Sequence, residues 1–534
     1  DQLQGAKPGQ KAVAELTDWP PQAKNPFGKI VKILGKPGDN EVEIHAILEE
    51  YNLPYSFDQK IEQEANNISP DIPSDEIQRR TDFRNITTIT IDPEDAKDFD
   101  DALSIEKINN DTYRIGVHIA DVSHYVKEKT LLEEEAYFRG TSVYLVDRVV
   151  PMLPERLSNN ICSLRPDEDK LTFSAVFDLN LDGKILSSWF GKTIIRSNRR
   201  FSYEEVQQII ENQEGELYDE INILDTIARV IRNKRMKSGA IAFDKKEVKF
   251  RLDDKGKPLS VYYKEQKEAH KLIEEYMLLA NKAVAERIGK IRGKSQPRTF
   301  VYRIHDIPNP EKLNSLSEFV SKLGYKLKTD TRKNISKSLN SLLKESEGKG
   351  EENLIETLAI RSMAKAEYST QNIGHYGLAF DYYTHFTSPI RRYPDLMVHR
   401  LLHAYLNNAN SFPSEVYEEK CVHSTEREKL AQIAERDSIK LKQVEFLSDK
   451  IGETYKGVIS GVSKWGLFVE LIENKCEGMI RLNDMTDDYY YLDEDNYQVI
   501  GHNTRQKYKL GDEIHITIKG VNVHRKEIDF VMAE

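Results

Sequence analysis

Cysteine and long hydrophobic runs are both scarce in this sequence. Its 534 residues include only three cysteines, which lie far apart at Cys162, Cys421 and Cys476. No apolar stretch approaches the roughly 20 residues that a membrane-spanning helix needs. Residues 1–11 are polar and lack the basic segment and apolar run of a secretion signal. We therefore expect a protein without a zinc site or a membrane function, in a reducing, cytoplasmic setting.

An excess of basic residues is also missing. The chain has 77 Lys and Arg against 88 Asp and Glu, a net charge of −11. This balance counts against a protein that coats nucleic acid non-specifically, because such binding needs surplus cations to meet phosphates. A nuclease is not excluded, since a buried metal site concentrates carboxylates and a local basic channel can coexist with an acidic surface.

The length predicts several domains, because one hydrophobic core stops growing at roughly 250 to 300 residues. The hydrophobic pattern predicts a multidomain α+β protein in which OB-type β-barrels flank a large mixed α+β domain. Period-two alternation over 11–47 predicts short antiparallel strands. In the centre, strand-like runs cover 113–119, 171–179 and 189–195, and helical patterns cover 269–288 and 353–368. The expected divisions are a partial barrel at 1–48, a polar linker at 49–84, the central domain at 85–412, a helical segment completing it at 413–448 and a five-stranded barrel at 452–534.

Four aspartates lie close together where a strand-like run ends. Asp92 closes the run, and Asp98, Asp100 and Asp101 follow within nine residues. Such crowded carboxylates repel one another unless a cation is present. The interposed Phe99 and apolar flanks indicate partial burial, which is costly for unpaired charges. Hard oxygen ligands select Mg²⁺ or Mn²⁺, and two such ions can activate water and offset charge on a leaving oxygen during phosphodiester hydrolysis.

Two other interpretations of this segment compete with a catalytic metal site. An Asp-rich stretch in an arbitrary protein is most often a solvated acidic loop. A calcium loop of the EF-hand type is the other alternative, but residues 98–102 lack its third alternating ligand and its turn glycine.

The segment from Ser388 to Tyr393 has features of a helix start. Ser388 is a good N-cap, and Pro389 would follow at the first helical position. Backbone N–H groups at a helix start favour an anion, and Arg391 and Arg392 could grip phosphate in a bidentate manner. The alternative is a surface cap with two solvated arginines.

Five separated segments stand out along the chain: 92–102 (DPEDAKDFDDA), 116–126 (GVHIADVSHYV), 151–159 (PMLPERLSN), 269–277 (AHKLIEEYM) and 385–396 (HFTSPIRRYPDL). In this order they resemble the ribonuclease II and ribonuclease R family of 3′-to-5′ exoribonucleases. The resemblance spans nearly the whole chain and is greatest to bacterial ribonuclease R.

This resemblance implies roles for particular residues. The metal site would comprise Asp92, Asp98, Asp100 and Asp101, with Asp92 and Asp101 as the most direct ligands. Asp100 would also be catalytic by orienting or polarising a second metal or the water. Arg391 would steady the scissile phosphate, with Arg392 as its catalytic neighbour. Two aromatic residues, Tyr144 and Phe243, would clamp the terminal bases, and Glu435 would lie near the RNA terminus. Without the resemblance, an isolated aromatic residue is more often part of the hydrophobic core.

The resemblance also implies an activity and partners. The resemblance implies processive degradation of single-stranded RNA, or of structured RNA with a 3′ overhang, to 5′-nucleoside monophosphates. The reaction would use two-metal catalysis with Mg²⁺, with Mn²⁺ as the alternative ion. A monomer is expected. The first barrel resembles the latter part of a cold-shock domain and the last an S1-type RNA-binding domain. Relatives usually carry further sequence before the first barrel and a lysine-rich tail after the last, so we expect a shortened form.

Two rival functions remain open at this point. The first is an RNA-binding regulator that uses its barrels and has an idle central domain, although all four aspartates are present. The second is a DNA-directed or endonucleolytic metal nuclease, which would use the same carboxylates.

His118 and His124 could share one face of a strand and turn, but we expect structural roles for them.

Overall fold

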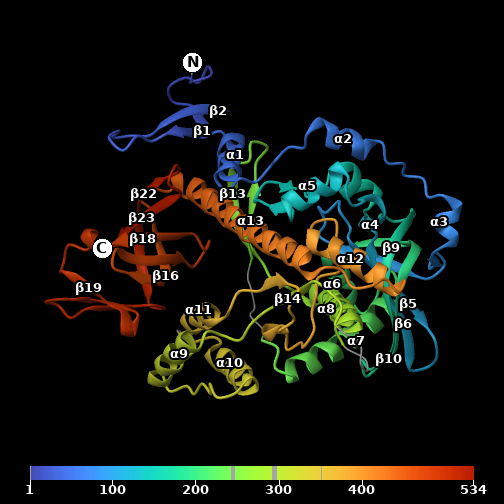
Figure 1. Ribbon diagram of the computed structural model, residues 1–534. Helices are drawn as coiled ribbons and strands as arrows, with labels where there is room; N and C mark the ends of the chain where they lie inside the picture. Colours follow the sequence, from blue (N-terminus) through green and yellow to red (C-terminus); the bar gives the residue numbers. More distant parts are fainter. Residues whose placement is uncertain (1, 242–246, 291–296, 350, 534) are drawn as a thin grey trace.

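The computed structural model describes residues 2–241, 247–290, 297–349 and 351–533. A small N-terminal sheet, a large mixed α+β part and a C-terminal barrel are arranged around the long helix α13 (Ser414–Ser448), as Figure 1 shows. Together these parts confirm the predicted multidomain α+β architecture. Among the described helices none is long and apolar enough to cross a membrane.

The N-terminal part is an antiparallel pair of strands followed by a helix. Strand β1 (Lys11–Asp18) pairs with β2 (Phe27–Gly35), and helix α1 (Asn40–Glu50) comes next. The prediction of strands as far as residue 47 is therefore wrong beyond β2. Ile44, Ile47 and Leu48 have helical spacing and are buried together, which period-two counting overlooked.

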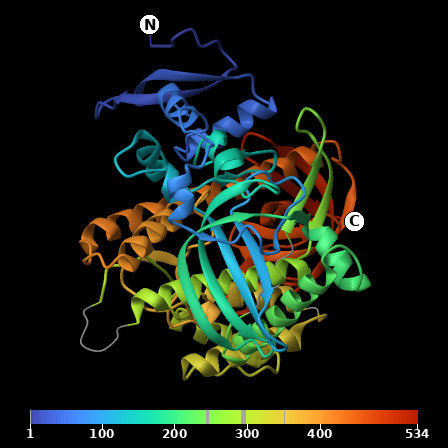
Figure 2. The same ribbon diagram turned by 90° about the vertical axis from the view of Figure 1, so that its right-hand side faces the viewer.

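A seven-stranded sheet forms the centre of the molecule. Its strand order is β11-β4-β5-β6-β9-β10-β3, antiparallel from β4 to β10, whereas β11 runs parallel to β4 and β3 parallel to β10. In Figure 2 its strands lie side by side in the middle of the protein. Strands β6, β9 and β10 confirm the three predicted runs. The bounds are β3 (Thr81–Asp82), β4 (Thr88–Asp92), β5 (Asp101–Lys107), β6 (Thr112–Ala120), β9 (Asp169–Asn180), β10 (Ile185–Arg196) and β11 (Arg199–Ser202).

Helices cover this sheet and share one hydrophobic core with it. Helix α6 contacts β4, and α8 contacts β6 and β9. Helix α8 confirms the helical pattern at 269–288. The predicted helix at 353–368 is too long, because α11 ends at Ser362 and the chain then pairs as β15 with β14. These elements are α6 (Tyr203–Asn212), α7 (Tyr218–Lys237), α8 (Glu268–Gly289), α11 (Glu352–Ser362), α12 (Tyr393–Leu406), β14 (Tyr302–Ile304) and β15 (Glu367–Ser369).

Shorter elements complete the central part. Helices α2 and α3 lie in the polar segment before the sheet, and α9 and α10 pack with α11. Two antiparallel hairpins, β7–β8 and β12–β13, contact α13. The bounds are α2 (Gln59–Asn66), α3 (Ser74–Gln78), α4 (Val122–Tyr125), α5 (Leu131–Arg139), α9 (Pro310–Lys322), α10 (Arg332–Ser346), β7 (Val143–Tyr144), β8 (Val149–Val150), β12 (Glu247–Leu252) and β13 (Pro258–Lys264).

The C-terminal part is a closed five-stranded barrel, as predicted. Its strand order is β16-β17-β18-β23-β22, and a separate three-stranded sheet, β19-β20-β21, lies between β18 and β22 in sequence. Closure removes the unpaired edges of the sheet. The barrel strands are β16 (Thr454–Ser463), β17 (Gly466–Leu471), β18 (Glu477–Arg481), β22 (Glu513–Asn522) and β23 (Glu527–Met532), and the other three are β19 (Tyr490–Asp493), β20 (Gln498–Gly501) and β21 (Lys507–Lys509).

Candidate functional site

Adjacent strands position the first and last of the four aspartates. Asp92 is the final residue of β4, and Asp101 is the first residue of β5, its antiparallel neighbour. The chain leaves the sheet after Asp92 and returns at Asp101. The two residues therefore lie at the same end of the neighbouring strands β4 and β5. Strand β11 pairs in parallel with β4 and places Ser202 beside Asp92.

The connection between these strands is held by hydrogen bonds that also fix Asp100. The N–H of Phe99 donates to Oγ of Ser163 at 3.0 Å, and that hydroxyl donates to the carbonyl of Lys97 at 2.8 Å. The N–H of Ala120 donates to the Asp100 carbonyl at 2.9 Å. The Asp100 side chain is buried, and its Oδ1 accepts the N–H of Ile390 at 2.9 Å. Asp100 is thus anchored through both its backbone and its side chain.

Burial makes all four carboxylates harder to ionise. Desolvation raises the pKa of Asp92 well above its usual value, and the charges of Asp101 and Asp98 raise it further. Desolvation likewise raises the pKa of Asp98, and that of Asp100 by a large margin. It raises the pKa of Asp101 to about 6, although Arg391 and Arg392 oppose the shift. The site therefore has a deficit of positive charge.

The residues present fit a divalent cation by their chemistry. The buried Oδ2 of Asp92 has no hydrogen-bond partner among the residues that the structure describes, which is costly unless another group binds it. Within the described ranges no three His, Cys, Asp or Glu side chains are grouped as a complete metal site. Mg²⁺ usually binds through one or two protein carboxylates, with water and substrate phosphate as its other ligands.

Arg391 is the exposed cation of the site. Its Nε lies 3.7 Å from Oδ2 of Asp100, its Nη2 donates to Oγ of Ser388 at 3.0 Å, and its side chain is 40% exposed. Arg392 differs, because Nε and Nη2 both donate to the Asp395 carboxylate at 2.8 Å. Arg391 is therefore available to an incoming anion, whereas the fork of Arg392 is already bound.

The predicted helix start at Ser388 is wrong. Residues 388–391 form a turn, Arg392 is the N-cap, and Pro394 lies in the first turn of α12. The N–H groups of Ser388 and Ile390 donate to Asp395 and Asp100 rather than facing an open anion site. Pro389 and Pro394 both have positions that suit a helix start, and the structure uses Pro394. The Asp395 carboxylate in the first turn of α12 accepts the Ser388 N–H, which keeps Ser388 outside the helix.

Tyr144 lies beside Arg391, as its predicted role requires. The N–H of Ser142 donates to the Arg391 carbonyl at 2.9 Å, which joins the segment before β7 to the arginine turn. The Tyr144 side chain is 38% exposed, whereas burial of its hydroxyl raises the pKa to about 12; Arg391 lowers this pKa, and Asp98 raises it. An accessible ring therefore carries a hydroxyl that faces the charged groups.

The other two predicted RNA-binding residues are not placed in this cluster. Phe243 lies outside the described residues. Glu435 lies on the surface of α13; partial burial of its carboxyl raises its pKa, the charge of Lys249 of β12 lowers it, and that of Glu247 raises it. The charges that act on Glu435 are therefore those of the β12–β13 hairpin and not those of the four aspartates.

Sequence reasoning missed Tyr203, the first residue of α6. It follows Ser202, which pairs with Asp92 in the sheet; burial raises the pKa of its hydroxyl, and the charges of Asp101 and Asp92 raise it further. Its ring stacks on His270 at 4.0 Å between centroids. A capping box between Ser202 and Glu205 starts the helix here. That Ser-x-x-Glu pattern is readable in the sequence and predicts a helix start here, but it does not place the residue beside the aspartates.

The histidines near Asp121 have structural environments, as expected. His118 is fully buried, with ring nitrogens 2.6 Å from Oγ of Ser174 and 2.8 Å from Oγ of Ser104. His124 is half-buried beside Arg80, 3.4 Å from its Nη2. Neither lies among the four aspartates.

Comparison with known proteins matches each of the three parts. The RNB domain model matches residues 80–408, the cold shock domain model 1–58, and the S1 RNA binding domain model 448–532. Ribonuclease R of Thermotoga maritima is 40% identical over 100% of this chain and 76% of its own length. Ribonuclease R of Aquifex aeolicus is 37% identical over 99% of the chain and 76% of its length. RNase R of Mycoplasma genitalium, solved with ribose-methylated single-stranded RNA, aligns with a TM-score of 0.91 at 28% identity, covering 99% of this chain and 84% of that one.

The fold and site define a multidomain protein in which a central RNB domain carries a carboxylate cluster between OB-type domains. The chain belongs to the RNB-domain family. The two relatives from Thermotoga and Aquifex, which align with 100% and 99% of the chain, are ribonuclease R proteins. The chain spans about three quarters of the length of these two relatives.

Proposed function

We propose that this chain is a 3′-to-5′ exoribonuclease that degrades single-stranded and 3′-tailed RNA to 5′-nucleoside monophosphates. The observation that carries the proposal is the buried aspartate cluster beside the exposed Arg391, with an unpartnered oxygen on Asp92. Relatives over the full length are ribonuclease R, and the Mycoplasma relative was solved with RNA. The intact aspartates favour this function over an RNA-binding regulator with an idle centre.

Asp92, Asp98, Asp100 and Asp101 would hold Mg²⁺ or Mn²⁺. When bound, such ions supply an acidified water and charge stabilisation on the leaving oxygen. Hydrolysis adds water across the P–O3′ bond of the last linkage, which releases a 5′-nucleoside monophosphate and leaves a new 3′-hydroxyl. Arg391 would bind the scissile phosphate, because its guanidinium is exposed and within reach of the same cluster. Asp100 holds its orientation through the Ile390 N–H.

A polarity assay tests the proposed function. RNA labelled at its 3′ end should release labelled mononucleotide from the first time point, and a blocked 3′ end should prevent this. DNA of the same sequence should persist. Internal fragments that appear from 3′-blocked RNA would indicate an endonuclease, and binding without cleavage would indicate a regulator; either result would refute the proposal.

Tyr144 provides a separate prediction about binding. We expect Tyr144→Ala to weaken binding of a short RNA by about 1 to 3 kcal/mol, because a stacking ring is lost. Tyr144→Phe keeps the ring and should bind nearly as well as the parent. Fluorescence anisotropy with a chelator present measures this without cleavage. Equal affinity of the alanine variant and the parent would exclude Tyr144 from the binding surface.

A further inference from the structure

The hairpin β12–β13 has one apolar and one charged face. In its antiparallel register Val248 pairs with Tyr263, and Phe250 pairs with Val261, so these side chains share one face. This face lies toward α13 and the barrel: β13 contacts α13, and burial raises the pKa of the Tyr263 hydroxyl, with Glu470 of β17 raising it further. The apolar face therefore seats the hairpin on the protein.

The opposite face is basic and carries an exposed aromatic ring. Its cross-strand pairs are Glu247 with Lys264, Lys249 with Tyr262, and Arg251 with Ser260. Lys249 is 48% exposed and Tyr262 is 45% exposed. The Arg251 guanidinium lies over the Tyr262 ring at 5.9 Å and has no acidic partner within the described residues. Lys249 pairs with Glu247 at 3.3 Å and Lys264 with Glu204 of α6 at 3.7 Å, so among the described residues Arg251 is the cation of this face that has no carboxylate partner.

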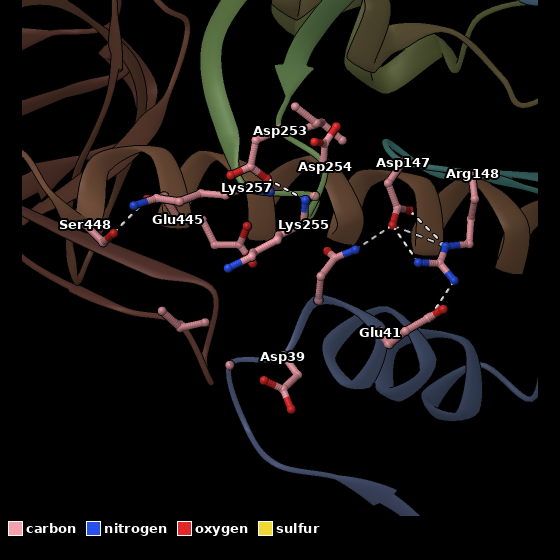
Figure 3. Close-up of a pocket in the computed structure, with 15 residues that line it drawn as sticks. Asp39, Glu41, Asp147, Arg148, Asp253, Asp254, Lys255, Lys257, Glu445 and Ser448 are labelled. Carbon is pink, nitrogen blue, oxygen red and sulfur yellow. Dashed lines mark hydrogen bonds and ion pairs between the residues drawn. The ribbon is translucent and has the colours of Figure 1, made fainter.

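The two ends of the hairpin lie at different places. At its base, Nζ of Lys264 is 3.7 Å from Glu204, which follows two residues after Ser202, the partner of Asp92 in the sheet. Its tip, residues 253–257, lines a cavity of about 940 Å³ together with Asn40, Arg148 and residues of α13 and the barrel (Figure 3). Six strand residues at about 3.3 Å each give the basic face a length of about 20 Å. It extends from the junction of the N-terminal part and the barrel toward the aspartate site.

The tip is fixed by Lys442 of α13, whose side chain is fully buried. Its Nζ donates to the Gly256 carbonyl at 2.7 Å, to Oδ1 of Asn40 at 2.6 Å and to Glu445 at 2.8 Å. Gly256 has a φ of +77°, and a Cβ there would lie 2.6 Å from Nδ2 of Asn40. Only glycine suits this contact. The hairpin is therefore a fixed surface, anchored at its tip and along its apolar face.

We infer that the basic face, formed by Lys249, Arg251, Tyr262 and Lys264, binds the ribose-phosphate backbone of single-stranded RNA on its way to the aspartate site. This inference rests on the proposed function. Lysine and arginine in a row bind phosphates whatever the sequence, and a tyrosine ring stacks on any base. The charge of the face selects a polyanion, and the lone exposed ring suits unpaired bases.

The test uses the double variant Lys249→Glu, Arg251→Glu in the full chain. For a long RNA that reaches from the aspartates to the junction cavity, we expect KM to rise at least about tenfold with kcat unchanged, because phosphate contacts outside the reacting bond are lost. A tetranucleotide confined to the aspartate site should show unchanged KM and kcat. The salt dependence of long-RNA binding should fall by about 0.7 per lost phosphate contact.

Lys290→Glu is the matched control. Lys290 is 54% exposed and ion-paired like Lys249, and it follows α8, which runs for about 33 Å from its start near His270. It should change neither parameter. Equal losses on long and short RNA, or none on either, would overturn the inference.

Binding of long RNA with a chelator present separates this inference from the proposed function. If the parent binds but does not cleave, and the double variant loses binding, the proposed function fails and the inference stands. If the parent cleaves, and the double variant binds long RNA with parental affinity and salt dependence, the inference alone fails. Circular dichroism of both variants verifies that they are folded.

Discussion

Asp100→Asn is expected to reduce RNA cleavage by about 10²- to 10³-fold or more while RNA binding remains near the parental level. The buried carboxylate accepts the Ile390 N–H at 2.9 Å and lies 3.7 Å from Arg391. Asparagine has the same shape and can still accept the Ile390 N–H through its amide oxygen, so the local fold should persist. It lacks the negative charge that the proposed cation would need. Single-turnover cleavage and anisotropy binding measure the two effects separately.

Asp95→Asn is the matched control for this experiment. Asp95 lies in the same connection between β4 and β5, but its side chain is exposed. It should leave cleavage unchanged. A parental rate in Asp100→Asn, or equal losses in both variants, would contradict a specific role for Asp100.

Asp121→Asn is expected to lower the free energy of unfolding by about 3 to 5 kcal/mol. Asp121 is fully buried. It accepts a hydrogen bond from Nη2 of Arg80 at 2.8 Å and forms an ion pair with Lys192. Burial alone would raise its pKa, but Lys192 and Arg80 lower it well below the usual value. The ionised form therefore stabilises the fold above the ordinary aspartate pKa, and this is lost only as pH falls through the lower native value. Asparagine would leave Lys192 without its counter-charge and Arg80 with Glu76 as its remaining acidic partner.

Urea denaturation at neutral pH measures this loss. Asp178→Asn is the control, because Asp178 pairs with the more exposed Arg114 at 2.9 Å on the same sheet. Surface pairs of this kind contribute about 0 to 1 kcal/mol. If Asp121→Asn changed stability no more than Asp178→Asn, the buried ion cluster would not be a main support of the fold.

The sequence predicted those features that depend on local pattern. Strand-like runs located β6, β9 and β10, and the hydrophobic pattern located the closed barrel. The sequence also predicted that a strand ends at Asp92 and that three more aspartates crowd together after it. The structure adds that Asp101 begins β5, the antiparallel neighbour of β4, so that both residues lie at the same end of adjacent strands.

Features set by distant contacts could not be predicted in this way. The start of α12 depends on Asp395 accepting the Ser388 N–H, and the same carboxylate binds Arg392. The place of Tyr203 depends on β11 pairing in parallel with β4 across more than a hundred residues. The direction of the basic face of the β12–β13 hairpin can be known only from contacts distant in sequence: Lys264 at its base with Glu204, and Gly256 at its tip with Lys442. Each case needs the partner strand or side chain to be known.

Equilibrium binding of Mn²⁺ tests most directly whether the aspartate cluster holds divalent cations. The parent should bind Mn²⁺ saturably in calorimetry without RNA, and Asp92→Asn should weaken this binding at least about tenfold, because the unpartnered buried Oδ2 of Asp92 is then replaced by an amide. Asp95→Asn should bind as the parent does. Absence of saturable binding in the parent, or equal affinity in Asp92→Asn, would contradict the cation site on which the proposed hydrolysis depends.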